Sequence, residues 1–114
     1  VADSSGAANA DMVTVALADN TSTRLTGTVT VSNDTDNGGG GFSDVVAHYE
    51  RVGGGAPALV GASVGGVAQV GAAIATAAIS FVVSGNNVIL RGAGVAAKDI
   101  HWSGEVVART TRIA

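Results

Sequence analysis

The segment ISFVVSGNNVILR, residues 79–91, decides the fold of this chain. Ile79, Phe81 and Val83 occupy alternate positions before a Ser-Gly-Asn-Asn run at 84–87, and a second apolar run follows. Alternation with a period of two is typical of a strand, and glycine and asparagine tolerate the backbone of a tight turn. The segment therefore predicts a β-hairpin.

The same alternation recurs toward the N-terminus, at residues 13–17 and 25–31, where threonines separate larger apolar residues in the second stretch. The stretch 72–83 begins with helix-favouring alanines but ends as a strand. No stretch sustains the helical period, so we predict an all-β fold, a β-sandwich or jelly roll of about eight short antiparallel strands. The remaining predicted strands are 44–52, 58–62, 67–70, 88–91, 100–102 and 104–113.

Small and β-branched residues dominate the composition. The sequence contains 21 Ala and 17 Gly, together a third of its 114 residues, and 18 Val and five Ile against four Leu. Such a bias favours strands, and a chain of this length forms one domain. We predict a single domain over 1–114, with 1–10 as an extended N-terminal arm. Because small residues bury little surface, we also predict that copies of the chain assemble through the uncharged strands between 52 and 90.

Charge and hydropathy exclude two classes of partner. The formal net charge is −3, the basic residues are dispersed and aromatic residues are 4% of the chain, a composition unsuited to nucleic-acid binding. The 39 residues between Arg51 and Arg91 carry no charge, but glycines and polar residues interrupt every window that could span a membrane. Without cysteine, the chain has no thiolate metal site.

Two patterns resemble enzyme motifs but lack the surrounding structure that each motif requires. Ser63 lies in a nucleophile-elbow pattern at 61–65, with Asp99 and His101 following in the order of a catalytic triad. That elbow requires a strand-to-helix turn on a parallel sheet. The GAGVAA run at 92–97 fits a dinucleotide fingerprint, but too few residues remain for the βαβ unit it needs. We predict a loop there, with glycines that permit positive φ, and assign no catalytic or cofactor-binding residue.

The polar stretch NDTDNGGGG at 33–41 is predicted to be a flexible loop that tolerates deletion of Gly38–Gly41. It also spaces oxygen-bearing side chains as a calcium loop does, but without the required acidic end positions or flanking helices. We assign no metal ligand, and a loosely bound Ca²⁺ remains an open alternative. The residues of this pattern are Asn33, Asp34, Thr35, Asp36, Asn37, Gly38 and Asp44.

Each of the two histidines precedes an aromatic residue, in His48-Tyr49 and His101-Trp102. Adjacent residues of a strand face opposite sides, so Trp102 is predicted to lie in the core. A platform for stacking sugar rings on Trp102 or Tyr49 is the alternative. Two histidines without a third nitrogen or sulfur ligand do not define a metal site.

The chain from about Asp44 onward resembles the terminal β-domains of tailed-bacteriophage structural proteins: tail fibres, appendages and head decorations. The resemblance rests on DVVAHYER (44–51), ISFVVSGNNVILRGAG (79–94) and IHWSGEVVAR (100–109). It implies a non-enzymatic structural component located in the virion, usually a homotrimer in contact with other virion proteins. A glycan on the host surface is a further candidate partner.

The alternative is a carbohydrate-binding β-sandwich module of a secreted or surface protein. Such a module relies on exposed aromatic side chains and often on Ca²⁺. The shortage of aromatic residues favours the structural hypothesis.

Overall fold

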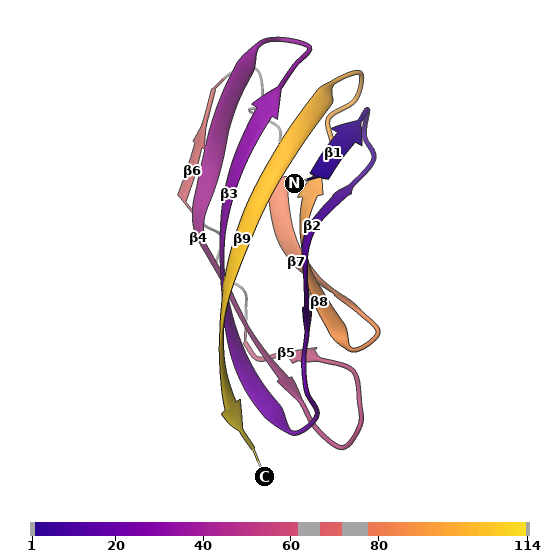
Figure 1. Cartoon of the computed structure of the whole chain (residues 1–114), viewed down its shortest axis with the longest axis vertical. Helices are drawn as coiled ribbons and strands as arrows, with labels where there is room; N and C mark the ends of the chain where they lie inside the picture. The colour runs from indigo at the N-terminus through magenta and orange to yellow at the C-terminus, as the bar shows by residue number, and fades with distance from the viewer. Residues whose placement is uncertain (1, 62–66, 72–77, 114) are drawn as a thin grey trace.

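The computed structural model describes residues 2–61, 67–71 and 78–113, and these residues form nine strands in two antiparallel sheets (Figure 1). The predicted all-β, sandwich-type fold is confirmed. The strands are β1 (Ala2–Ser5), β2 (Ala10–Ala16), β3 (Thr21–Asn33), β4 (Gly38–Arg51), β5 (Ala58–Leu59), β6 (Val67–Val70), β7 (Ala78–Ser84), β8 (Asn87–Ala93) and β9 (Asp99–Arg112).

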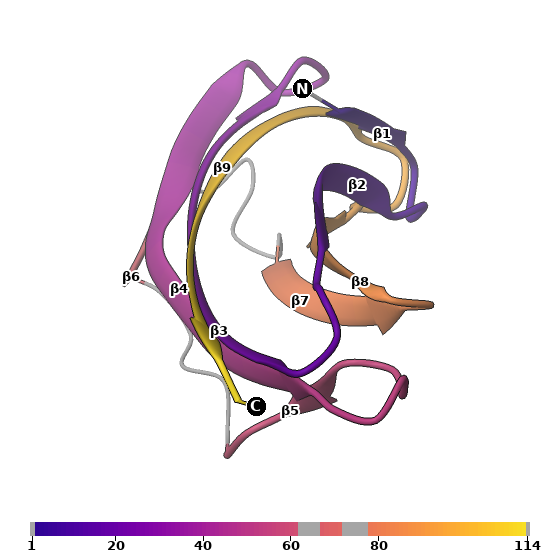
Figure 2. The same ribbon diagram turned by 60° about the horizontal axis from the view of Figure 1, so that its bottom comes forward.

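The larger sheet has the order β1-β9-β3-β4-β5, and β6 also pairs with β4. It curls into a half-barrel around the smaller sheet, which has the order β2-β8-β7 (Figure 2). The predicted hairpin at 79–91 forms β7 and β8, with Gly85 at a φ of 59° in its turn. Among the described residues, no helix has the length and hydropathy of a membrane span.

Strict alternation along β3 builds the core. Every odd-numbered residue of β3 from Thr21 to Asn33 is buried, which confirms the alternation read at 25–31. Leu25, Val29 and Val31 among them belong to the two core clusters, which also contain Val88 and Leu90 of the smaller sheet. Trp102 is 0% exposed, as predicted, and Tyr49 is 4% exposed, so neither ring is free to stack on a sugar.

The stretch 33–41 is not a flexible loop, contrary to expectation. β3 continues to Asn33 and β4 begins at Gly38, so the glycine run pairs with β3 along the ladder. A glycine lacks a side chain but keeps both backbone hydrogen-bonding groups. A Cβ at Gly41 would lie 2.7 Å from the carbonyl oxygen of Val29, so the close approach of the strands requires glycine there. Deletion of the run would remove the part of β4 that pairs with β3 at this end, so tolerance of the deletion is no longer expected.

Part of the extended arm expected at 1–10 is paired with the larger sheet. β1 pairs with the beginning of β9, from Ala2 opposite Trp102 to Ser5 opposite Asp99. The indole Nε1–H of Trp102 donates to Ser4 Oγ at 3.0 Å, a bond buried inside the protein. This bond and the backbone pairing together hold β1 on the sheet.

Two further expectations differ from the structure, and a third falls outside the described residues. The strands expected at 100–102 and 104–113 are one strand, β9, because Gly104 lets it pass closely under Met12 and Leu90. Gly92 and Gly94, the glycines of 92–97, do not have positive φ. A Cβ atom at either position would instead lie closer than 3.0 Å to neighbouring atoms. The pattern around Ser63 lies largely outside the described residues, as do residues 72–77.

Candidate functional site

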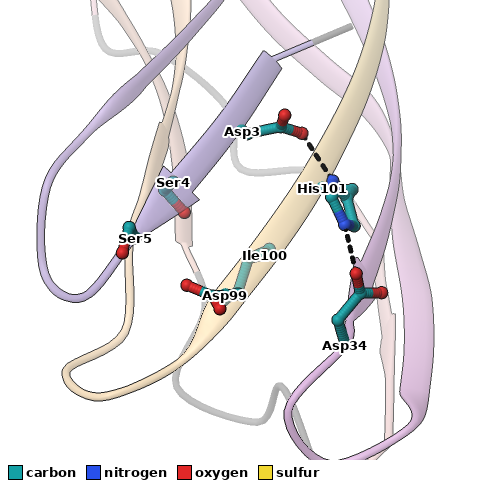
Figure 3. A pocket seen from close by; sticks show the side chains of 7 residues that line it. All are labelled: Asp3, Ser4, Ser5, Asp34, Asp99, Ile100 and His101. Atoms are coloured by element: carbon teal, nitrogen blue, oxygen red, sulfur yellow. Dashed lines mark hydrogen bonds and ion pairs between the residues drawn. The ribbon is translucent and has the colours of Figure 1, made fainter.

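A pocket of about 300 Å³ opens where β1, the start of β9 and the β3–β4 turn meet (Figure 3). It combines three carboxylates with one imidazole. Its lining residues are Asp3, Ser4, Ser5, Asp34, Asp99, Ile100 and His101.

Strand register and turn contacts bring these residues together. Antiparallel pairing of β1 with β9 places Asp3 directly opposite His101. The β3–β4 turn is fastened to β9 by two bonds: the Asp34 N–H donates to the Asp99 carbonyl oxygen at 2.9 Å, and the Asp99 N–H donates to Thr35 Oγ1 at 3.0 Å. Asp34 is therefore held on the other side of His101.

The side chain of Asn33 holds the β3–β4 turn in place by hydrogen bonds to its backbone. This side chain is buried, and its Oδ1 accepts hydrogen bonds from the backbone N–H groups of Thr35 at 2.9 Å and Asp36 at 3.2 Å. Asp36 forms an ion pair with Lys98, whose hydrogen bond holds the pKa of the Asp36 carboxyl below its usual value. Asn33, Thr35 and Asp36 of the calcium-like pattern are thus engaged within the turn and with residues 98–99, and the described residues contain no group of three or more acidic or histidine side chains that could hold a metal ion.

His101 lies in a clasp between two carboxylates. Its Nδ1 is 2.5 Å from Asp3 Oδ1, and its Nε2 is 2.5 Å from Asp34 Oδ2 (Figure 3). The hydrogen bond to Asp3, followed by that to Asp34, raises the pKa of His101 to about 9. The ring is therefore an imidazolium at neutral pH, and both of its N–H groups donate.

This protonation state limits the chemistry of the pocket. A general base needs a free nitrogen lone pair, and the clasped His101 has none at neutral pH. Asp99 lines the same pocket, but His101 is bound to Asp3 and Asp34 instead of to Asp99. The arrangement is suited to joining β1, the β3–β4 turn and β9.

The second histidine does not contribute to the pocket. His48 lies opposite Arg24 near one end of β3, whereas His101 lies opposite Ser32 near the other. His48 Nε2 is 2.5 Å from the hydroxyl of Ser22. The sequence singled out His101 but not Asp3 as its partner, because these residues are 98 positions apart and only the register of β1 on β9 joins them.

Comparisons of the chain with protein-family models, with curated proteins and with solved structures found no match. Its class is therefore defined by geometry: a two-sheet antiparallel β-sandwich whose larger sheet is half-curled.

We expect the His101 clasp to stabilise the fold in a pH-dependent way. The pKa of His101 is raised from 6.5 to about 9 by folding, so the stabilisation is fully present below 6.5 and is lost as the pH rises through about 9. Urea unfolding of the wild type and of His101→Gln should show the largest difference in free energy at about pH 6 and the smallest near pH 10.

The matched control for this comparison is His48→Gln, since His48 contacts a hydroxyl in place of two carboxylates. Its difference from the wild type should not follow the His101 profile. A His101→Gln difference that stays constant across the pH range would show that the imidazolium clasp does not contribute to stability.

Proposed function

We propose that this chain is a non-enzymatic structural component of a phage virion, of the tail-fibre, appendage or head-decoration type, that assembles with copies of itself. The virion assignment is supported by the resemblance carried by residues 44–51, 79–94 and 100–109. The assembly is supported by the surface of the larger sheet.

Exposed apolar side chains at the β5 edge carry the proposal. Val52, Leu59 and Val60 are 49%, 45% and 45% exposed. They flank the end of the larger sheet, where β5 pairs with β4 and, within the described residues, with no other strand. A sheet edge with exposed apolar side chains is a template for pairing with another chain. We assign a second copy of this chain as its partner, in the uncharged region expected to form the interface.

The resemblance implies three copies, and a contact between the β5 edge and a different surface of the next copy is of the kind that closes a ring. The His101 clasp is consistent with a structural role, because it holds β1 and the β3–β4 turn against β9 without offering a free base.

We expect the double substitution Leu59→Ser with Val60→Ser to weaken assembly. Removing two exposed apolar side chains from the interface lowers the area buried between copies but leaves the cores intact. Light scattering at tens of micromolar should show a trimer, or a multiple of a trimer, for the wild type and a smaller species for the variant. The control is Val83→Ser on β7, where an equally exposed valine lies in the other sheet.

The virion assignment has its own test. An antibody raised against the purified chain should label tailed particles released from cells that carry its coding sequence. Particles that remain unlabelled would contradict the assignment, and a wild-type monomer at the concentrations above would contradict self-assembly.

The alternative, a carbohydrate-binding module, lacks its usual platform. The chain has four aromatic residues: Phe42, Tyr49 and Trp102 are buried, and Phe81 packs against both core clusters. Binding of the purified chain to an immobilised glycan would favour the alternative.

A further inference from the structure

One edge of β9 is unpaired over most of its length. On one side β9 pairs with β3 from Ile100 to Arg112. On the other side it pairs with β1 over Asp99–Trp102, and in the described part of the chain no strand is hydrogen-bonded to Ser103–Arg112, although β2 packs nearby (Figure 1). Such an edge presents backbone N–H and C=O groups for a further strand.

We propose that this edge pairs antiparallel with β9 of a second copy, about a two-fold axis at Val107. The inference rests on the proposed function in that copies of the chain must meet, and it names a second surface at which they do so. It is separate from the β5 edge.

The register follows from the charges along β9. Residues that face each other across an antiparallel pair have their side chains on the same face of the sheet. A two-fold axis perpendicular to the sheet must therefore lie between one residue and the same residue of the second copy. An axis at Val107 places Glu105 of each copy opposite Arg109 of the other, which gives two pairs of opposite charge. Moving the axis by one residue places Glu105 opposite Val107 or Thr111 and leaves no such pair.

Two neighbouring arginines beside this edge favour the same register. On the convex face of the sheet, Arg24 of β3 lies directly opposite Arg109 of β9. Like charges directly opposite each other are unfavourable. The ion pairs formed by the described residues involve neither arginine nor Glu105. Glu105 of a second copy would extend this row with the missing negative charge.

Apolar surface lies at the centre of the same edge. Val107 is 51% exposed. In the proposed register, the Val107 side chains of the two copies meet at the axis and cover each other, while Val106 of each copy lies opposite Ala108 on the inner face. Charge, register and apolar exposure therefore converge on a second copy as the occupant.

A two-fold contact closes on itself and yields a dimer. Where a three-fold contact at the β5 edge is also present, the β9 contact joins two rings. The two surfaces are therefore compatible, and each is tested by substitutions at its own residues.

A charge-reversal experiment tests the β9 contact by sedimentation velocity. Glu105→Arg and Arg109→Glu each place like charges opposite each other in the symmetric pair, so each variant alone should bind itself about 100-fold more weakly than the wild type. An equimolar mixture of the two variants restores opposite charges at both positions, and should regain the mass lost by each alone. The double variant E105R/R109E is the matched control and should associate like the wild type.

Both positions are exposed, so neither substitution removes core packing. Recovery of mass in the mixture supports the contact, since an effect on folding would persist there. If the single variants keep the wild-type mass, or if the mixture fails to recover it, the β9 contact is wrong. Failure of the proposed function is read separately, from unlabelled particles or from an unchanged mass of the Leu59 and Val60 variant.

Discussion

Replacing Trp102 by alanine is expected to lower the free energy of unfolding by about 3–5 kcal/mol, the usual loss for a large buried aromatic side chain. Trp102 is 0% exposed and belongs to the core cluster that joins the two sheets. Its indole N–H also bonds to Ser4, so the substitution leaves a buried hydroxyl without its donor and loosens β1. Urea denaturation followed by far-UV circular dichroism measures the loss.

The conservative variant Trp102→Phe separates packing from hydrogen bonding. It keeps most of the aromatic contact but not the donor, so its loss should be roughly half that of Trp102→Ala. A Trp102→Ala protein within about 1 kcal/mol of the wild type would contradict the assignment of this ring to the centre of the core.

The strands in which apolar and polar residues alternate regularly could be predicted from the sequence. Leu25, Val29 and Val31 occupy every second or fourth position, and the structure buries all three on one face of β3. The turn at Gly85 was equally predictable, because the left-handed backbone there favours the residue types found. In both cases the conformation is decided by residues that are close together in the sequence.

The glycine run at Gly38–Gly41 could not be placed in the same way. Sequence patterns are read from side chains, and glycine has none, so the run resembles a loop. In the folded chain its backbone pairs with β3, whose own alternation has already fixed the register. The strand therefore depends on a partner and not on its own composition.

The pocket could not be predicted from the sequence, for a related reason. Asp34 and His101 are 67 residues apart, and nothing local to either indicates the other. Their approach requires the β3–β4 turn to be fastened to β9 through Asp99. A site made by the register of distant strands becomes visible only once the sheet order is known.

Space, and not backbone conformation, explains why position 94 is glycine. A Cβ added at Gly94 would lie 2.2 Å from the carbonyl oxygen of Ala8 and 2.4 Å from that of Gly6. Both oxygens belong to the connection between β1 and β2, and the Gly6 N–H is itself bonded to the Lys98 carbonyl oxygen at 3.0 Å. The connection cannot retreat without disturbing this bond and the neighbouring end of β1.

We therefore expect Gly94→Ala to destabilise the protein by about 3 kcal/mol, at the upper end of the usual range for overpacking. Gly71→Ala is the matched control: its Cβ would meet one oxygen at 3.6 Å, an ordinary contact, so the change should be neutral or slightly stabilising. Urea denaturation compares the two variants, and equal stabilities would show that the β1–β2 connection yields freely. If the connection instead resists, the strain reaches β1, and the near-UV circular dichroism of Trp102 should weaken because β1 supplies the hydroxyl that holds the indole.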